Sequence, residues 1–515
     1  MMKLQKRITY FLILITLISG CSKIDLFDKK SSNKELKFFN FIVSQNPSLP
    51  QDIYCEIKGD SVLGVAFSGT DLSKLKPSFV FEGKEVLVNN QPQNSGVNVQ
   101  DFTTPVTYNI KAEDGSIKSY FVKFRDTSLP VLYISTNNVA IQSKEIYVKG
   151  TLEIKEGLTN KTLFSGATEI RGRGNSTWGF PKKPYKIKLD KKSKLLGINE
   201  AKQWVLLANY ADKSLLRNEL GFELSRRLGL AYTPSSRFVD VALNNQYIGN
   251  YQLVEQIEVS PTKVNVAEQK MGNSNISGGY LVEVDGFAST EKVYFMTPYR
   301  MPISVHYPDD EDITSEQKSY IRGHIEKFEK ALFSTNFDDP IDGYKKYFDI
   351  DSYINFYLVN EIIGNPDLFW STYFYKNQND DKIYAGPVWD FDLSANNDNR
   401  LGDFQNKLML TTAHEPKMWI NRLMQDKVFR NKIRQRWNEL KTNKLQNLPF
   451  YIDQLSIKIN ASQKKNFTKW NILNEKVYRN FQAAGSFDAE IIYLKNFYIS
   501  RIGWLDTQFN GSRFD

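Results

Sequence analysis

Three aspartates lie at the two ends of one predicted β-hairpin. Asp367 follows the turn at residues 364–366 and precedes an aromatic, strand-like run over residues 370–376. After a polar tip, the second arm ends in Asp390 and Asp392. The outer ends of the two arms of a hairpin lie together, so we expect all three carboxylates to be close in space. Paired carboxylates suit a hard cation such as Mg²⁺, which takes oxygen ligands and keeps waters for a substrate phosphate.

A second polar motif reads Arg-Gly-Arg-Gly-Asn-Ser-Thr over residues 171–177. Its spacing is not that of the P-loop, and Thr177 stands where a kinase-type loop has its third glycine. The residue types nevertheless suit an anion. Flexible glycines, short polar side chains and the guanidinium groups of Arg171 and Arg173 can wrap a polyanion.

An amphipathic helix is predicted between these two motifs. Leucines recur every four residues over residues 214–228, which gives the segment one apolar stripe. Asp212 or Ser214 is expected to cap the start of the helix, and Gly229 is expected to end it.

Strands come before the hairpin, and helices lie on both sides of it. Residues 237–258 read as a two-stranded hairpin and residues 278–285 as a further strand, where Glu283 and Asp285 are interpreted as the solubilising charges of an edge strand. Apolar residues three or four apart then predict helices over residues 315–333, 349–364, 418–441, 448–462 and 489–509.

The segment before these motifs reads as a β-sandwich. Short β-branched or aromatic runs are separated by Asn, Gly, Pro and Asp, and Asp114-Gly115 is a hairpin turn signal. The segment resembles the bacterial Ig-like modules found beside surface lipoproteins, and we interpret it as a spacer rather than a ligand-binding module. The predicted strands cover residues 39–44, 52–59, 61–68, 77–83, 107–114 and 118–126.

The start of the chain reads as a secretory leader. Lys3, Lys6 and Arg7 precede an apolar run over residues 10–18 that is short for a membrane span. Residues 18–21, Ile-Ser-Gly-Cys, resemble a bacterial lipobox that ends in Cys21. We therefore expect a signal peptide over residues 1–20, a tether over residues 21–35, and a mature chain that is lipid-anchored at Cys21 in the cell envelope, outside the cytoplasm. The remaining cysteine, Cys55, has no partner for a disulfide.

Charge and histidine content exclude several classes of function. The chain has 515 residues and a net charge of +9, of which the three leader cations account for 3, so the mature chain carries 9 − 3 = +6. This mild, dispersed charge argues against a nucleic-acid partner. His306, His324 and His414 fit no zinc motif, and we place His324 on a helix surface. No G-x-S-x-G nucleophile elbow is present.

Several motifs occur together in one order along the chain. They are Arg-Gly-Arg-Gly-Asn-Ser-Thr at 171–177, Phe-Pro-Lys-Lys-Pro-Tyr-Lys-Ile-Lys-Leu at 180–189, Leu-Leu-Arg-Asn at 215–218, Trp-Asp-Phe-Asp at 389–392, and runs at 419–426, 436–440 and 501–506. In these motifs the chain resembles the CotH kinase family, the spore-coat-type atypical kinases. The resemblance implies an α+β chain in which a β-sandwich over residues 36–127 is followed by a two-lobed, atypical protein-kinase-like domain over residues 130–512.

The resemblance also implies a chemistry, the transfer of phosphate from ATP to a hydroxyl of a protein substrate, with Mg²⁺ or alternatively Mn²⁺. Asp367 would orient or deprotonate the acceptor, and Asp390, with Asp392 as the alternative, would bind the metal. A strand lysine would neutralise the phosphates, with a helix glutamate as its partner, and a connector between the lobes would hold the adenine. The residues implied for the cofactor are Lys188, Lys186, Lys183, Arg171, Arg173, Glu255 and Glu219, with Glu223 as the alternative to Glu219.

The choice among the three lysines stays open. Alternation over residues 185–189 places the apolar side chains on one strand face and Lys186 and Lys188 on the other, and Lys183 lies just before the strand. Each of these lysines also reads as part of a solvated strand face.

Two alternatives to a protein kinase also stay open. Kinase-like loops carry an Asn a few residues after the catalytic Asp, and here Ser371 and Thr372 stand at those positions. The lipobox also predicts a location where ATP is scarce. One alternative is a non-catalytic surface binding or assembly protein built on a kinase-like scaffold. The other is a transferase that uses a different phosphorylated or nucleotide donor.

Overall fold

The computed structural model describes residues 30–49, 52–66, 70–126, 129–157, 161–269 and 275–514. The leader, Cys21 and most of the tether lie outside these described residues. The chain divides into two compact units, Met1–Asp126 and Thr127–Asp515. None of the helices in the described part has the length and apolar character needed to cross a membrane.

The N-terminal unit is built from two sheets that share one core. The strand orders are β2-β1-β5 and β3-β4-β9-β8-β6-β7. Aromatic side chains from both sheets meet in the core, where the rings of Phe39 and Tyr108 are 5.0 Å apart. The predicted turn at Asp114-Gly115 joins β8 to β9, and Gly115 has a φ of +86°. The strands are β1 (Glu35–Phe41), β2 (Ile53–Tyr54), β3 (Glu56–Lys58), β4 (Ser61–Ala66), β5 (Ser78–Glu82), β6 (Glu85–Val88), β7 (Gln91–Pro92), β8 (Val106–Lys111) and β9 (Ile117–Asp126).

A closed barrel opens the C-terminal unit, with the strand order β10-β11-β12-β13-β14-β16-β15. On β13 the predicted alternation is confirmed, because Tyr185, Ile187 and Leu189 are buried while Lys186 and Lys188 are half-buried on the other face. The strands are β10 (Val131–Ser135), β11 (Val148–Lys155), β12 (Thr162–Gly172), β13 (Tyr185–Ser193), β14 (Ala201–Leu207), β15 (Ser236–Leu243) and β16 (Gln246–Glu255), with a 3₁₀ turn at η1 (Ser176–Gly179).

The helix α2 (Arg217–Leu228) lies between β14 and β15 in the chain. It begins three residues later than the pattern predicts. Asp212 holds the preceding turn through the backbone N–H and hydroxyl of Ser214, and accepts the N–H of Arg217 at 2.8 Å. Gly229 ends the helix in the left-handed conformation, as predicted.

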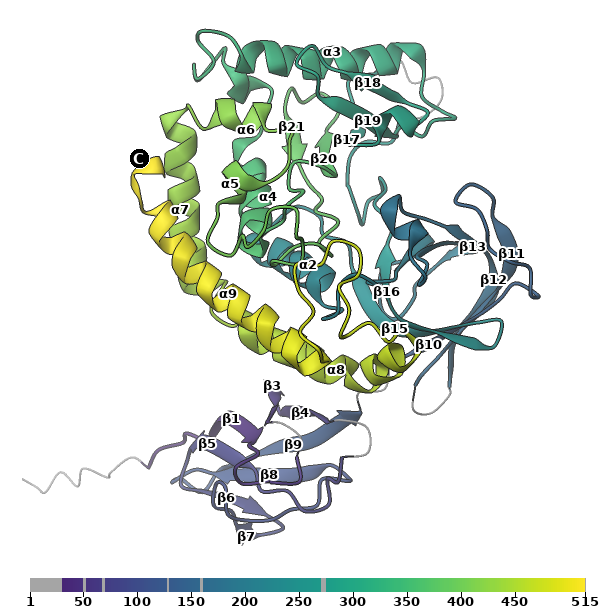
Figure 1. The fold of residues 1–515 in the computed structure, drawn as a ribbon. Coiled ribbons are helices and arrows are strands. Elements are labelled where there is room, and N and C mark those ends of the chain that lie inside the picture. The colour runs from purple at the N-terminus through teal and green to yellow at the C-terminus, as the bar shows by residue number, and fades with distance from the viewer. Residues whose placement is uncertain are drawn as a thin grey trace, which may run out of the picture. The chain divides into compact units, whose positions relative to one another are not determined.

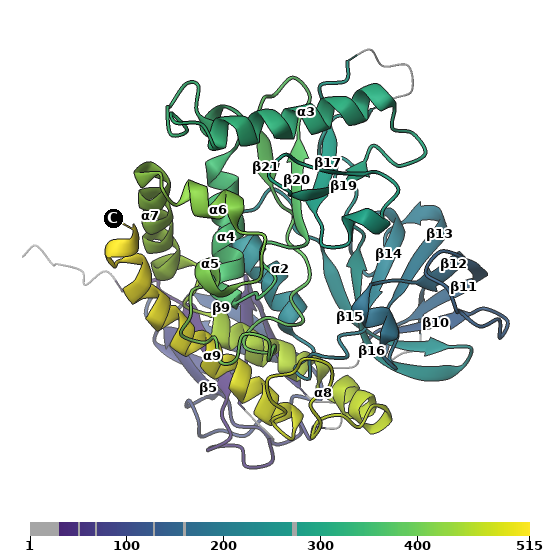
Figure 2. The same ribbon diagram turned by 45° about the horizontal axis from the view of Figure 1, so that its top comes forward.

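A second sheet and a set of helices complete this unit. The sheet has the order β18-β19-β17-β20-β21, so β17 is a central strand. Figures 1 and 2 show α3 lying across this sheet and α7, α8 and α9 lying together along one side of the unit. The elements are β17 (Tyr280–Val284), η2 (Ala288–Thr290), β18 (Tyr294–Met296), β19 (Pro302–Tyr307), α3 (Ser315–Leu332), η3 (Tyr344–Lys346), α4 (Ile350–Ile363), β20 (Thr372–Lys376), β21 (Ile383–Ala385), α5 (Met409–Thr412), α6 (Met418–Leu423), α7 (Lys427–Asn443), α8 (Leu448–Lys469), α9 (Phe487–Phe509) and η4 (Ser512–Phe514).

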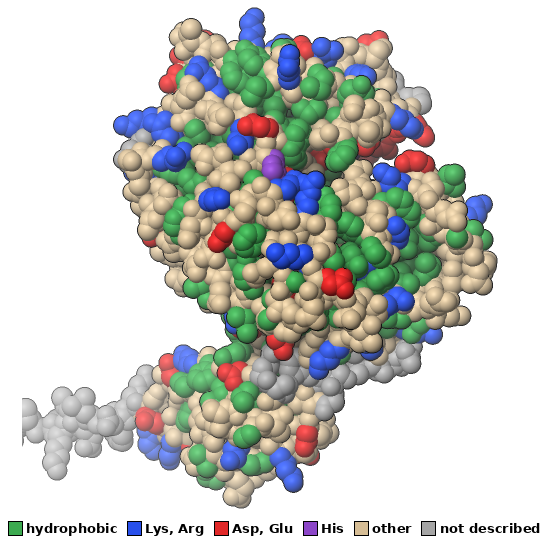
Figure 3. Space-filling model, in the orientation of Figure 1, with side chains coloured by type: hydrophobic (Ala, Val, Ile, Leu, Met, Phe, Trp, Pro, Cys, Tyr) green, Lys and Arg blue, Asp and Glu red, His purple; other side chains and the backbone are tan. Residues whose placement is uncertain are grey.

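The chain is therefore a mixed α and β protein, with a strand-rich first part and a second part of strands and helices. One large apolar core joins α2, α4, the β17–β21 sheet and the C-terminal helices, and a separate core fills the barrel. The segment at residues 171–177 continues from the end of the barrel strand β12, and the segment at residues 386–398 contributes Val388, Phe391 and Ala395 to the large core. Figure 3 shows acidic and basic side chains interspersed over the visible face of the unit.

Candidate functional site

The hairpin that was predicted to gather the carboxylates is present, since β20 and β21 pair as antiparallel strands. α4 delivers Asp367 before the first arm, and Asp390 and Asp392 follow the second. The three groups interact. Desolvation and the nearby Asp367 raise the pKa of Asp390. Desolvation and the charge of Asp390 raise the pKa of Asp392 well above the usual range of an aspartate. The hairpin therefore places like charges together, an arrangement that favours a cationic ligand.

The backbone of Asp390 has a φ of +68°, in the left-handed region that non-glycine residues seldom adopt. Such a conformation costs about 1 kcal/mol or more and persists only where neighbours hold it. The next N–H, that of Phe391, donates to the side-chain oxygen of Asn218 at 2.9 Å. α2 thus fixes the turn that presents Asp390.

Two sets of contacts hold Asp367. Its backbone N–H donates to Asn365 at 3.0 Å. One side-chain oxygen, Oδ2, accepts from Nη2 of Arg400 at 2.7 Å. The same guanidinium bonds both oxygens of Asp398, which is fully buried, through Nε at 2.7 and 3.0 Å. Neither Asp398 nor Arg400 was predicted as a site residue. The only sequence signal is their position shortly after the Trp-Asp-Phe-Asp motif.

The loop at residues 171–177 reaches the same site through one of its two arginines. The guanidinium of Arg173 lies 5.5 Å from the ring centre of Trp389. Desolvation lowers the pKa of Arg173, and the nearby Asp390 opposes that effect. Arg171 is held to one side, where it donates to the carbonyl of Lys144 and stacks over Tyr147 at 5.0 Å. Of the pair, Arg173 is the cation beside the carboxylates.

The structure separates the three candidate lysines. Lys183 donates to the carbonyl of Trp178 at 2.6 Å, and Lys188 lies 3.8 Å from Glu169, its partner across the β12–β13 pair. Among the described residues, Lys186 has neither an ion pair nor a hydrogen bond. Desolvation, with the charges of nearby arginines, lowers the pKa of Lys186 to about 8. Lys186 is thus the lysine of the three with an uncommitted ammonium group.

The glutamates implied as cofactor residues lie elsewhere. Glu219 of α2 accepts from Arg226 at 2.6 Å and from Gln252 at 3.0 Å, and Glu223 pairs with Arg226 and Arg227. No helix glutamate therefore pairs with a candidate lysine among the described residues. At the end of β16, Glu255 is buried and accepts the backbone N–H of Ser235 at 2.8 Å, while Oε1 has no partner among the described groups.

The interpretation of Glu283 and Asp285 as edge-strand charges is wrong. Both residues are buried, and β17 is a central strand. Glu283 bonds Nε2 of His306 at 2.6 Å. Desolvation lowers the pKa of His306, but this hydrogen bond and the charge of Glu283 outweigh it and raise the pKa above the usual value. The two residues lie near Arg173, whose electrostatic neighbours include Glu283.

The prediction for His324 is also wrong. The side chain is 4% exposed, and Nε2 lies 2.9 Å from the carbonyl oxygen of Asp381. Desolvation lowers its pKa to about 4. This histidine is part of the packing of α3 against the end of the β20–β21 hairpin.

The donor set suits Mg²⁺ better than a metal that needs a protein cage. Within the described residues no group of three or more His, Cys, Asp or Glu side chains is arranged to hold a metal ion. Mg²⁺ is commonly bound by one or two carboxylates, with waters and phosphate oxygens as the other ligands. Asp390 and Asp392 fit that pattern. Thr372 does not extend it, because its buried hydroxyl donates to the carbonyl of Leu368 at 3.1 Å.

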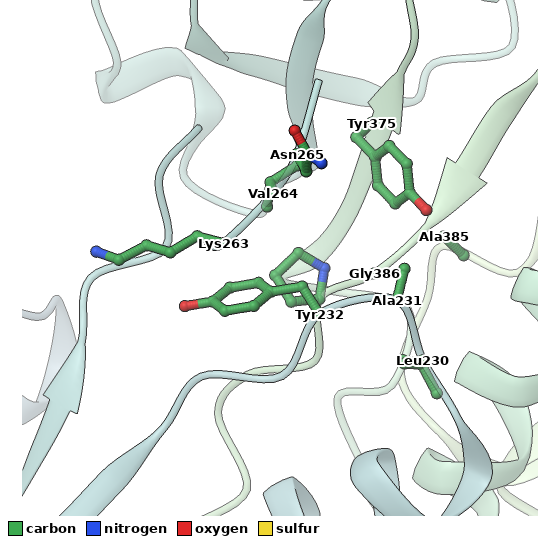
Figure 4. Close-up of a pocket in the computed structure, with 10 residues that line it drawn as sticks. Leu230, Ala231, Tyr232, Lys263, Val264, Asn265, Tyr375, Ala385 and Gly386 are labelled. Carbon is green, nitrogen blue, oxygen red and sulfur yellow. The ribbon is translucent and has the colours of Figure 1, made fainter. Parts of the chain in front are cut away.

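A small cavity of about 70 Å³ lies beside the hairpin, next to Gly386 and Pro387. Figure 4 shows Tyr232 and Tyr375 on opposite sides of this space. Ligand pockets for drug-sized molecules are roughly 300–1,000 Å³. The cavity is therefore too small for a nucleoside in this conformation.

Comparison with known proteins adds a family to this geometry. The model described as CotH kinase protein matches residues 170–505, and the model described as SGBP, N-terminal matches residues 58–124. No curated protein matches the chain. A solved structure from Bacteroides thetaiotaomicron VPI-5482, whose title proposes a glycoside hydrolase, shares 21% identity and has a TM-score of 0.17. That match covers 30% of this chain and 40% of the other. The family match spans most of the chain, from the Arg-Gly-Arg loop to the last helix, and the protein belongs to the CotH kinase protein family.

Proposed function

We propose that the C-terminal unit is an atypical protein kinase that transfers the terminal phosphate of ATP to a protein hydroxyl. One observation carries the proposal. Arg173 and the clustered carboxylates of the hairpin lie together, and an uncommitted lysine stands on the neighbouring strand β13. Phosphoryl transfer depends mainly on positioning and on neutralising phosphate charge, and these groups supply both. Membership of the family supports the same conclusion.

Each side chain has a defined task in this proposal. Lys186 and Arg173 bind phosphate oxygens, and Asp390 and Asp392 hold Mg²⁺ or Mn²⁺. When bound, the ion neutralises charge on the phosphates. Asp367 accepts the proton of the acceptor hydroxyl on Oδ1 as the new oxygen–phosphorus bond forms and the bond between the β- and γ-phosphates breaks, which releases ADP. Arg400 occupies Oδ2 and so leaves Oδ1 as the oxygen for this role.

The proposal includes a two-lobed arrangement. The barrel and α2 would form the first lobe, and the β17–β21 sheet with the remaining helices would form the second. Residues 256–279, part of which lies outside the described chain, connect them. A lipid anchor at Cys21 would place the kinase in the cell envelope, with its protein substrate at the surface or in the envelope.

The test is the transfer of radiolabelled γ-phosphate from ATP with Mg²⁺ or Mn²⁺. The chain from residue 22 onward would be incubated alone and with envelope proteins, beside Asp367→Asn and Asp390→Asn. As a control, Asp342→Asn removes an exposed carboxylate whose side chain is 82% exposed. We expect labelling by the wild type and the control and its loss in the two site variants. Equal labelling by all four proteins would contradict the proposal.

A non-catalytic surface binding or assembly protein is the second candidate. Two observations favour it. Asp367 is already engaged in an ion pair, and the Thr372 hydroxyl, at a position implied for a second metal ligand, is committed to the backbone. This candidate predicts no labelling and no rise in melting temperature with ATP and Mg²⁺. A melting shift without labelling would instead point to another acceptor.

A further inference from the structure

The two faces of the β17–β21 sheet differ in character. Val282 of β17 and Val305 of β19 belong to the large core. Successive side chains of a strand point to opposite faces, so Glu283 and His306 lie on the other face of the sheet. A small apolar cluster on that face packs against Trp389, the first residue of the Trp-Asp-Phe-Asp motif. The charged pair therefore lies on the face of the sheet that is turned toward the motif.

The imidazole of His306 is held through one of its two ring nitrogens. Nε2 donates to Oε2 of Glu283 at 2.6 Å and lies 3.2 Å from the hydroxyl of Ser304. Glu283 is 7% exposed, and Ser304 is fully buried. The hydroxyl of Tyr373, opposite Glu283 in the β17–β20 pair, also donates to this carboxylate. Buried neighbours thus fix the orientation of the ring.

The other ring nitrogen of His306, Nδ1, has no hydrogen-bond partner among the described residues, and 31% of the side chain is exposed. The hydrogen bond and the charge of Glu283 outweigh desolvation and raise the pKa of His306, and Glu291 and Asp285 act in the same direction. The imidazolium form, in which both nitrogens carry a proton, is therefore favoured. A fixed imidazolium with an unpartnered Nδ1–H is a donor for an anion.

Groups of the proposed phosphotransfer site surround the same glutamate. Arg173 and Asp390 both have Glu283 among their electrostatic neighbours. The guanidinium of Arg173 lies 5.5 Å from the ring centre of Trp389, the residue before Asp390. His306 is thus placed on the sheet side of the site, and Arg173 on its barrel side.

We propose that His306 is a further substrate-binding residue, whose Nδ1–H donates to an oxygen of the terminal phosphate of ATP while Glu283 positions the ring. The inference rests on the proposed function, which supplies this phosphate. The terminal phosphate is the one nearest to the β17–β21 sheet, because Asp367, the group that meets the acceptor, directly precedes strand β20 of this sheet. Arg173 and His306 then hold the transferred group from two different elements.

Calorimetric titration of the chain from residue 22 onward with ATP, ADP and AMP, each with Mg²⁺, tests this contact. His306→Gln keeps a donor for Glu283 but removes Nδ1 and the charge. We expect this variant to bind ATP about tenfold or more weakly, as for the loss of a charged hydrogen-bond donor, and to bind ADP and AMP as the wild type does. His306→Lys keeps a cation beside Glu283 and should recover most of the ATP affinity.

Lys292→Gln is the control for a change of net charge. Lys292 lies between η2 and β18, and its side chain is 77% exposed. This variant loses one positive charge, as His306→Gln does, and should bind ATP as the wild type does. Melting curves without ligand check that each variant is folded. If His306→Gln is unstable, Glu283→Gln keeps the test decisive, because it removes the charge that favours the imidazolium and should also weaken the binding of ATP but not of AMP.

Two results would overturn the inference. They are equal ATP affinity in the wild type and His306→Gln, and an equal loss of affinity for ATP, ADP and AMP, which would assign the histidine to packing alone. If the wild type transfers phosphate and either result is obtained, only this inference fails. If the wild type neither transfers phosphate nor binds ATP, the proposed function fails, and inorganic tripolyphosphate replaces ATP as the probe. Weaker binding of tripolyphosphate by His306→Gln would then support a phosphate contact, and equal or absent binding would overturn it.

Discussion

At the scale of single residues, the site differs from its surroundings in which charges are left unpaired. Lys188 and Lys186 stand on the same strand face, two residues apart, yet Glu169 lies opposite only one of them. The register of the β12–β13 pair places Glu169 opposite Lys188 and Arg171 opposite Lys186, so only Lys188 has a carboxylate partner across the pair.

Lys186→Ala should lower phosphate transfer by about a hundredfold or more, whereas Lys188→Ala should change it by less than about threefold, because a bound phosphate loses a charged partner only in the first case.

The pKa of Lys186 is lowered to about 8, so its charged form dominates below that pH and is lost above it. Transfer rates measured against pH should therefore fall as the pH rises through about 8. Lys186→Arg keeps its charge and should remove this alkaline fall. The same fall in both proteins would contradict the role of Lys186.

Arg400→Gln should destabilise the protein by about 3 kcal/mol, because it leaves the fully buried Asp398 without its counter-charge. Denaturant unfolding measures the loss. Asp398→Asn combined with Arg400→Gln removes both charges and should recover most of the stability. Transfer should stay low in the double variant, since Asp367 has still lost its 2.7 Å contact. Full recovery of transfer would show that Arg400 acts only on stability.

Some features of the site could be predicted from the sequence, and others could not. The hairpin, its carboxylates and the strand alternation follow from local periodicity, and the hairpin pairing and the alternation are both observed. The strand order is not local. The residues next to β17 in the chain do not indicate that it becomes a central strand. Glu283 was therefore interpreted as a surface charge. The Arg400–Asp398 pair was missed for a similar reason, because a loop with no periodicity carries it.

At the scale of elements, α2 is the helix on which the arrangement of the site depends. Gly221 of α2 packs directly against the ring of Phe391, which occupies the space that a side chain at residue 221 would need. A Cβ built at Gly221 would lie 2.1 Å from that ring. The packing of the Trp-Asp-Phe-Asp segment against α2 therefore requires glycine at residue 221.

Gly221→Ala should destabilise the protein, although alanine is more favourable than glycine in the interior of a helix by about 1 kcal/mol. The clash with Phe391 outweighs that gain. Gly323→Ala in α3 is the matched control, because a Cβ there meets nothing within 4 Å, and it should stabilise by up to about 1 kcal/mol. Thermal unfolding of the two variants checks the opposite signs. Stabilisation of Gly221→Ala would show that the ring moves aside freely.

At the scale of the whole molecule, the two units have separate cores. The buried side chains of each core come from one unit only, so each unit should fold alone. The chain from residue 129 onward should keep the melting temperature of the second unit and its transfer activity. Calorimetry of this fragment beside the longer chain measures both transitions, and loss of cooperative unfolding in the fragment would show that it depends on the N-terminal unit.

The closure of the barrel affects how neighbouring copies of the protein can interact at high local concentration. β10 pairs with β15 in parallel, which joins the first strand of the barrel to one near its end. Open sheet edges invite strands of neighbouring molecules to add on, and closure removes those edges. The barrel therefore has no open strand edge to which a strand of a neighbouring copy could pair, even at high local concentration of the protein.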